Sequence, residues 1–302
     1  MLQTANSLFS LIANTIVATI TQTQVAADNF SQFMHWDISP TIGIFEGGPL
    51  QIRWYGLFFA LSFVLGYQIM QYIFQKEGKN LKDLESLTLT MILGTVLGAR
   101  LGHCLFYSPE YYLSNPLEIL KIWEGGLASH GAMLGIPFAL WIFSRKHKDF
   151  EYFWIIDRIV IVVALSGFFI RMGNFFNSEI VGKVTDVPWA IVFSRIDEMP
   201  RQPSQIYEAV TYLFIFMILA YRYVVNNFNI AKGKSLGLFL MLIFGARFFW
   251  EFTKENQVDF ESALPLNMGQ LLSIPAVLVG AYLFFIFKSQ KNEIINTKQS
   301  KK

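Results

Sequence analysis

The stretch that decides the fold is WIIDRIVIVVALSGFFIRMGNF, residues 154–175. A helix needs about 20 mostly apolar residues to cross a bilayer core about 30 Å thick, and this stretch is long and apolar enough to do so. Arg171 and Asn174 lie near its end. Polar groups at such a place are costly unless they have partners or a function. The stretch therefore predicts a membrane-spanning helix that ends in a polar site.

The whole chain has the composition of a membrane protein. Of its 302 residues, 53% are hydrophobic and only 15% are charged, whereas about 25% of the residues of soluble domains are charged. The mean hydropathy is +0.41. A net charge of +2 is too small to indicate a nucleic-acid partner, and Cys104, the one cysteine, allows no intramolecular disulfide. We therefore expect an all-α integral membrane protein.

Seven apolar segments predict a seven-transmembrane helix bundle. They lie near residues 52–74, 87–107, 127–144, 154–175, 206–225, 236–252 and 268–287. The connections after the first, third and fifth segments, and the C-terminal tail, are richer in Lys and Arg than the second and sixth connections. Because basic residues in short loops favour the cytoplasmic side, we expect the N-terminus outside and the C-terminus in the cytoplasm.

The segments also divide the chain into regions. Residues 37–287 form the predicted transmembrane domain, with an outer loop at about 176–205. Residues 1–36 are an N-terminal extension whose apolar part, Leu8–Ile20, is too short to span. A signal peptide, an interfacial helix and an outer tail are all open for it. Residues 288–302 are rich in lysine and predict a cytoplasmic tail near anionic membrane lipids.

Three arginines on three different segments predict an anion site. With this topology Arg100, Arg171 and Arg247 all lie toward the outer side of the membrane. An arginine at the centre of a span costs about 2.5–3.5 kcal/mol, so three at one level favour a shared anionic partner. A phospholipid headgroup fits, because guanidinium groups match phosphate oxygens with forked hydrogen bonds. The alternatives are a transporter of an anionic solute and pairing with carboxylates, namely those of Glu179, Glu208 or Glu251.

A histidine among small residues is the second unusual feature. His130 lies in GGLASHGA, residues 125–132, at the start of the third segment. It could be a core residue, a metal ligand or a proton acceptor. Four scattered histidines do not make a metal cluster, so we expect no metal. In the second segment Gly94, Gly98 and Gly102 recur every four residues and predict a helix-packing seam.

Seven ordered motifs resemble those of the bacterial prolipoprotein diacylglyceryl transferase family. RMGNFFNSEIVG, residues 171–182, is similar to the family signature G-R-x-G-N-F-x-N-x-E-x-x-G, and GGLASHGA resembles its histidine motif. The others are RWYGL (53–57), GARLGHCLFY (98–107), RQPSQIYE (201–208), GARFFWEF (245–252) and NMGQLLSIP (267–275). The resemblance covers about residues 37–287. Lys254 departs from the arginine of many relatives and lacks the fork for a bidentate phosphate contact.

The resemblance implies an activity. Members of this family transfer the diacylglyceryl group of phosphatidylglycerol to the thiol of the lipobox cysteine in the signal peptide of a preprolipoprotein. A thioether forms and glycerol phosphate leaves. The reaction takes place at the outer, periplasmic face of the bacterial inner membrane and needs no cofactor. This side agrees with the orientation predicted from the basic loops.

The resemblance also implies roles for individual residues. Arg171 and Arg247 would stabilise the charge of the leaving phosphate, because such stabilisation is strong in a low-dielectric site. His130 would accept the thiol proton, and Tyr55 is the alternative. The remaining matched positions would bind substrate: Arg100, Asn174, Glu179, Gly182, Arg201, Ser204, Tyr207 and Glu251.

Overall fold

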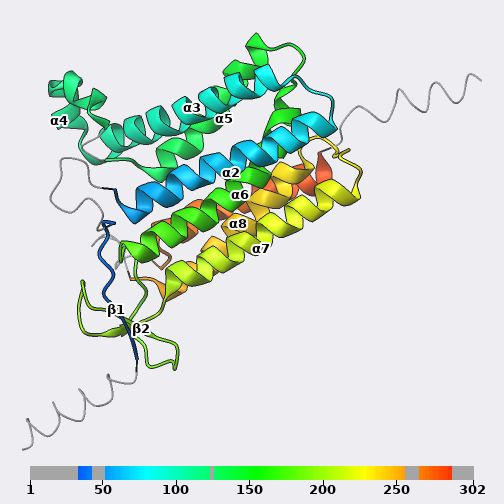
Figure 1. Cartoon of the computed structure of the whole chain (residues 1–302). Coiled ribbons are helices and arrows are strands. Elements are labelled where there is room, and N and C mark those ends of the chain that lie inside the picture. Colours follow the sequence, from blue (N-terminus) through cyan, green and yellow to red (C-terminus); the bar gives the residue numbers. More distant parts are fainter. Residues whose placement is uncertain (1–32, 43–51, 123–125, 256–264, 288–302) are drawn as a thin grey trace, which may run out of the picture.

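Each of the seven predicted segments forms a helix in the computed structural model, which describes residues 33–42, 52–122, 126–255 and 265–287 (Figure 1). The helices are α2 (Trp54–Lys76), α3 (Leu81–Tyr107), α5 (Ser129–Lys146), α6 (Tyr152–Phe176), α7 (Ser204–Val225), α8 (Lys234–Trp250) and α9 (Met268–Ala281). A 3-10 turn, Glu251–Thr253, extends α8, and a π-helical turn, Tyr282–Ile286, extends α9. After α3 come the short helix α4 (Pro109–Ser114) and a 3-10 helix, Pro116–Leu120. Residues 1–32 of the predicted N-terminal extension and the predicted tail 288–302 lie outside the described residues.

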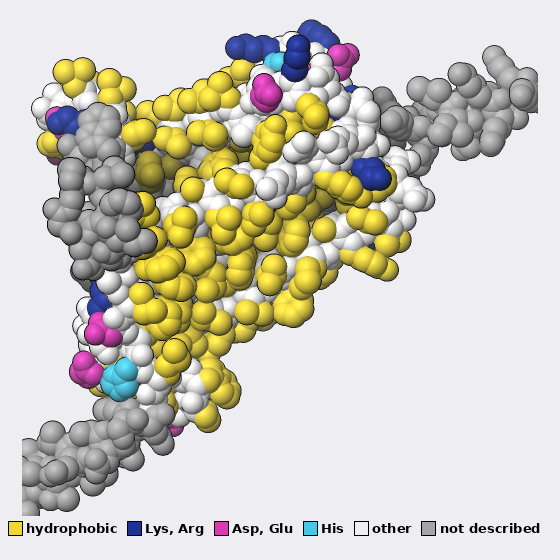
Figure 2. All heavy atoms as spheres, in the orientation of Figure 1, with side chains coloured by type: hydrophobic (Ala, Val, Ile, Leu, Met, Phe, Trp, Pro, Cys, Tyr) yellow, Lys and Arg dark blue, Asp and Glu magenta, His cyan; other side chains and the backbone are white. Residues whose placement is uncertain are grey.

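Six helices within the described residues are long and apolar enough to cross a membrane: α2, α3, α6, α7, α8 with its 3-10 turn, and α9 with its π turn. The expectation of an all-α membrane protein is thereby confirmed. The helix α5 is not among the six; it has 18 residues and carries Arg145 and Lys146 in its last turn. The count of seven spans and the orientation of the termini stay predictions. In Figure 2 hydrophobic side chains cover the flank of the bundle, and charged side chains gather at its ends.

The helix that contains the deciding stretch, α6, is the centre of the bundle. It packs against α2, α7 and α8, and Figure 1 shows it between α2 and α7. In its most apolar window 56% of the residues are buried, against 17–33% for the other five candidate spans. A helix that is apolar on all sides is expected in the interior of a bundle. The central place of α6 puts Arg171 and Asn174 in the middle of one end of the protein.

The helices α3 and α5 form an arm of their own, joined by the predicted glycine seam. A Cβ atom added to Gly98 would lie 2.7 Å from the carbonyl oxygen of Gly131, and one added to Gly102 would lie 2.5 Å from the Cα atom of Gly131. Side chains at these positions would therefore force the helices apart. The packing role of the seam is confirmed, and Cys104 on α3 is buried as expected for a small apolar residue.

A small three-stranded sheet covers the end of the bundle at which α6 ends and α7 begins (Figure 1). Its strands are β1 (Met34–Trp36), β2 (Ile191–Phe193) and β3 (Pro200–Arg201). β1 runs parallel to β2, with Met34 opposite Ile191, and β3 runs antiparallel to β2. The predicted outer loop thus contains two strands, and the last residues of the predicted N-terminal extension pair with it.

Candidate functional site

The site begins with an ion pair between α6 and α7. Arg171 lies near the end of α6, and its Nε atom is 3.0 Å from Oε2 of Glu208 in the second turn of α7. The side chains are 12% and 0% exposed. The Nη1 atom of Arg171 also donates to Oδ1 of Asn174 at 3.4 Å. Glu208, considered from sequence only as a possible partner of an arginine, is therefore part of the site.

A second ion pair follows at the end of α8. The Nε atom of Arg247 lies 3.4 Å from Oε1 of Glu251. Lys254 connects this pair to the first, because its Nζ atom lies 2.9 Å from Oε1 of Glu251 and 3.0 Å from Oε1 of Glu208. We call the five side chains of Arg171, Glu208, Lys254, Glu251 and Arg247 the charged network.

The charged network carries a surplus of positive charge. It holds three cations and two carboxylates, and buried charges are tolerated only when they are paired and hydrogen-bonded. Each carboxylate contacts one arginine and Lys254, which is only 2% exposed. The side chain of Arg247 is 33% exposed, and its Nε atom makes no hydrogen bond within the described part of the chain. The arrangement can therefore attract an anion to the arginines.

A hydrogen-bonded wall adjoins Arg171, where α6 ends. The side-chain amides of Asn174 and Asn177 donate to the two carboxylate oxygens of Glu179, at 3.0 and 3.1 Å. The backbone at Ser178 and Ile180 has φ of 55° and 54°, values that are unfavourable for residues with side chains. The hydrogen bonds to Glu179 hold this turn, which explains why polar residues follow the apolar stretch so regularly.

Tyr55 lies beside the same turn of α6. It belongs to the first turn of α2, and its ring packs against Gly173, where an added Cβ atom would lie 2.9 Å from Cδ2 of the tyrosine. Gly173 is between Arg171 and Asn174 in the chain. The structure therefore places Tyr55 beside Arg171 and Asn174, and its role as a proton acceptor stays a prediction.

Gly182 and Ser204 hold the loops around the charged network. The N–H group of Gly182 donates to the carbonyl oxygen of Gln202 at 3.1 Å. A Cβ atom at Gly182 would lie 2.5 Å from Oγ of Ser204, so no side chain fits there. The Ser204 hydroxyl lies 2.8 Å from Oγ1 of Thr253. These contacts join the start of α7 to the end of α8, the two places that carry Glu208 and Lys254.

Arg201 and Tyr207 each have their own partners beside these loops. The Nη2 atom of Arg201 lies 2.5 Å from Oδ2 of Asp197, and its Nη1 atom lies 3.1 Å from Oε1 of Glu255. The hydrogen bond from Arg201 lowers the pKa of the Asp197 carboxyl, and the hydrogen bond to Asp197 raises the pKa of Arg201. The Tyr207 hydroxyl accepts a hydrogen bond from Nε1 of Trp189 at 2.6 Å. The substrate-binding role implied for both residues stays a prediction.

Arg100 is fixed by the backbone of the α3–α5 arm. Its guanidinium donates to the carbonyl oxygens of Ile119 at 2.9 Å, Glu118 at 2.6 Å and Gly126 at 3.4 Å. Its side chain also lies over the ring of Tyr112. These contacts explain how an arginine that is only 3% exposed is tolerated. Its assignment to substrate binding stays a prediction.

His130 also belongs to the arm, as the second residue of α5. Its ring meets Phe106 edge-on, with centroids 5.1 Å apart, and lies 5.8 Å from the ring of Tyr107. Its Nε2 atom is buried and has no hydrogen-bond partner among the described residues. The interpretation as a satisfied core histidine does not fit this unpartnered nitrogen.

The contacts of Lys254 and Asn267 with the carboxylates were not predicted from the sequence. Lys254 was considered only as a weakened phosphate ligand, whereas the structure places it between two carboxylates. Asn267 donates from Nδ2 to Oε2 of Glu251 at 3.3 Å. The three-residue spacing of Glu251 and Lys254 could have indicated their pairing, because such residues are neighbours on a helix. In the described part of the chain no group of three His, Cys, Asp or Glu side chains could hold a metal ion.

Comparison with known proteins identifies the family. A family model described as prolipoprotein diacylglyceryl transferase matches residues 43–286. The chain belongs to this family. A phosphatidylglycerol–prolipoprotein diacylglyceryl transferase of Chloroherpeton thalassium is 48% identical over 255 residues, which cover 84% of this chain and 94% of that protein. Proteins of the same name from Tolumonas auensis and Bacteroides fragilis are 45% and 40% identical; they cover 85% and 88% of this chain and 99% of their own lengths. The protein is thus a multi-pass membrane transferase of the prolipoprotein diacylglyceryl transferase family.

Proposed function

We propose that this protein transfers the diacylglyceryl group of phosphatidylglycerol to the lipobox cysteine of a preprolipoprotein signal peptide. The sulfur attacks the glycerol carbon that carries the phosphate, so that a carbon–sulfur bond forms and the carbon–oxygen bond breaks. The oxygen leaves with the bonding electrons as part of glycerol phosphate, and the thiol proton passes to a base. The names of the relatives support both substrates.

The charged network is the observation that carries the proposal. The leaving phosphate gains negative charge as the carbon–oxygen bond breaks, and preorganised cations in a low-dielectric site stabilise such charge most strongly. Arg171 and Arg247 provide forked donors for phosphate oxygens. Lys254 shares both carboxylates with them, and this leaves one positive charge for the headgroup. Asn174, together with Glu179 and Glu251, holds the arginines in place.

His130 is the proposed general base. A free cysteine has a pKa of about 8.5, so only a small fraction is thiolate at neutral pH. A nearby base raises this fraction. The Nε2 atom supports this role, because it makes no hydrogen bond with another described residue and is therefore available to accept a proton. Tyr55, beside Arg171 on the neighbouring helix, is the alternative acceptor. Arg100 is proposed to bind substrate, and it also holds the Gly126 carbonyl in the loop before α5.

The loops around the charged network form the proposed rim for the signal peptide. Gly182 and Ser204 shape it by close backbone contact, and Arg201 and Tyr207 present their side chains at its edge. The peptide would approach from the sheet side of the bundle, where β2 and β3 lie.

We further propose seven spans, with α5 as the third, in the inner membrane of a bacterium. The N-terminus is outside, the C-terminus is cytoplasmic, and the site faces the periplasm. The basic last turn of α5 supports this orientation. Labelling of Lys148→Cys and Lys183→Cys in intact cells tests it, because both positions are exposed and the native Cys104 is buried. Lys183→Cys should react from outside and Lys148→Cys only after permeabilisation; the reverse result would overturn the orientation.

The direct test of function uses the purified protein with phosphatidylglycerol and a lipobox peptide, and measures the thioether product by mass. We expect transfer by the unaltered protein, and a large loss in Arg171→Ala and in Arg247→Ala. Folded protein that forms no thioether would refute the activity. An unchanged rate in Arg171→Ala would remove that residue from stabilisation of the leaving group.

A further inference from the structure

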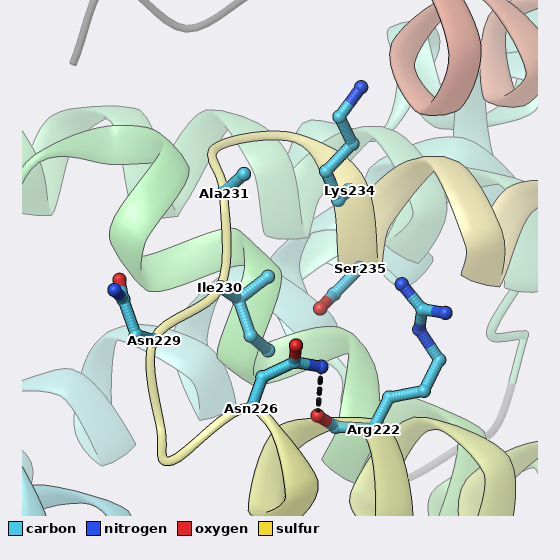
Figure 3. Close-up of a pocket in the computed structure, with 7 residues that line it drawn as sticks. All are labelled: Arg222, Asn226, Asn229, Ile230, Ala231, Lys234 and Ser235. Atoms are coloured by element: carbon cyan, nitrogen blue, oxygen red, sulfur yellow. Dashed lines mark hydrogen bonds between the residues drawn. The ribbon is translucent and has the colours of Figure 1, made fainter. Parts of the chain in front are cut away.

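A polar cavity of about 200 Å³ lies at the end of the bundle opposite the charged network, between the end of α7 and the start of α8 (Figure 3). Its polar lining comes from Arg222, Asn226, Asn229 and Ser235. In Figure 3 the Arg222 guanidinium and the Ser235 hydroxyl face the same space, with Asn226 beside them. None of these residues belongs to the charged network or to the proposed rim.

Ser235 is largely buried, and its hydroxyl opens to the cavity without a hydrogen-bond partner among the described residues. The residue is 6% exposed, and it makes no side-chain hydrogen bond with the described residues. Because the hydroxyl points into the cavity, it is free to donate a hydrogen bond to a ligand with acceptor oxygens.

The charges around the cavity favour an anion. Arg222 lies over the ring of Phe284 and forms no ion pair with a described residue. Lys234 adds positive charge, although its Nζ atom is held by backbone carbonyl oxygens, among them that of Phe284 at 2.6 Å. Asp157 is the nearby carboxylate; it accepts hydrogen bonds from the N–H groups of Gly233 and Leu236. Two cations against one carboxylate leave a positive surplus.

The surface next to the cavity is apolar. Tyr221 and Val225, beside Arg222 on α7, are 69% and 57% exposed, and Phe285 and Ile286 on the π turn are 72% and 65% exposed. Apolar exposed side chains that lead to a cationic cavity at the ends of membrane helices match the shape of a lipid, with acyl chains below and a headgroup above.

We propose that this cavity binds the phosphate group of an anionic membrane lipid. Arg222 donates to the phosphate from its forked guanidinium, the Ser235 hydroxyl donates a second hydrogen bond, and the amides of Asn226 and Asn229 close the site. The acyl chains lie along the exposed faces of α7 and the π turn. This lipid would be held at the end of the bundle away from the reaction and would not be the substrate molecule.

Hydrogen–deuterium exchange of the full chain in phosphatidylcholine nanodiscs, with rising fractions of phosphatidylglycerol, tests the site locally. Exchange in the segment 226–236 should slow as phosphatidylglycerol is added. Arg222→Gln should raise the fraction needed for half of the effect about tenfold or more, and Ser235→Ala should raise it less. Lys232→Gln is the matched control, because it removes a charge from the same loop but its amine pairs with Glu151 outside the cavity.

The remaining arms separate the alternatives. Arg222→Lys keeps the charge but loses the fork, so it should lie between the unaltered protein and Arg222→Gln. Inorganic phosphate added to phosphatidylcholine nanodiscs should have little effect; protection by inorganic phosphate but not by phosphatidylglycerol would overturn the assignment to a lipid. Equal protection in the unaltered protein and in Arg222→Gln would overturn the site altogether. None of these readouts depends on transferase activity.

Discussion

Replacing Lys254 by methionine should weaken both the fold and the reaction. Methionine has nearly the same length and no charge, so the change removes the contacts of 2.9 and 3.0 Å to Glu251 and Glu208 without leaving a large cavity. Removing one partner of a buried ion pair costs about 3–5 kcal/mol. Each carboxylate here keeps one arginine, so we expect the lower end of this range, about 3 kcal/mol of unfolding free energy.

The effect on the reaction follows from the same count of charges. Without Lys254 the charged network has two cations and two carboxylates, and each carboxylate is left with a single cation, its arginine. The positive surplus for the leaving phosphate is lost. Loss of one direct donor to a developing anion lowers a rate constant by about 10²–10³-fold. Lys254 acts through the arginines, so we expect a loss of about tenfold to a hundredfold, mainly in kcat.

Two measurements and one control decide this prediction. Denaturant unfolding in micelles gives the change in stability, and the rate of thioether formation gives kcat and KM. Lys254→Arg keeps a cation between the carboxylates and should retain most of both properties. Wild-type stability and rate in Lys254→Met would refute the reasoning. A stability loss without any fall in kcat would show that Lys254 is structural only.

Three further outcomes follow from the described contacts. His130→Gln keeps a hydrogen-bonding side chain but cannot accept the thiol proton, so transfer should fall about 10²-fold or more; a rate near wild type would exclude the general base. Gly131→Val should lower the midpoint of unfolding, whereas Gly56→Ala, with nothing within 4 Å of its added Cβ atom, should not; equal midpoints would contradict the seam. Arg201 lowers the pKa of Asp197, so the carboxylate stabilises the fold above its unfolded pKa of about 3.9 and loses this effect as pH falls through its lower folded pKa. Asp197→Asn should therefore be less stable at neutral pH; its deficit should begin to shrink near pH 3.9, at about the unfolded pKa, and vanish as pH falls through the lower folded pKa. A deficit that does not change with pH would contradict the pairing.

The sequence was sufficient to locate the helices. The period and length of apolar runs decide helix position in a membrane protein, and all seven predicted segments begin and end within about six residues of the observed helices. A polar site at the end of the fourth segment was also predicted, and Arg171, Asn174 and Glu179 of one motif do lie together there, because they are close in the chain. Local spacing therefore predicted what is local in the structure.

Contacts between segments that are distant in the chain could not be predicted from the sequence. β1 and β2 are three residues long and lie 157 positions apart in register, from Met34 to Ile191. No periodic pattern is readable in so short a strand. Depth in the membrane suggested one shared level for the three arginines, but depth does not give position around the bundle. Arg100 therefore proved to be held by the arm, while Arg171 and Arg247 meet through Lys254.

Because the glycine seam joins α3 and α5 into one unit, the position of this arm relative to the other helices can change without loss of stability in either part. The helices α3 and α5 touch each other far more extensively than α5 touches α6 or α3 touches α2, and at Gly98 and Gly102 the two backbones lie too close for a larger side chain. His130 is carried by this pair, and both arginines of the charged network are carried by the rest of the bundle. The distance between the proposed base and the phosphate therefore depends on the few contacts that the arm makes with α2 and α6. Substitutions there can alter the rate while both parts stay fully folded, so a survey of stability alone would overlook the residues that tune the enzyme.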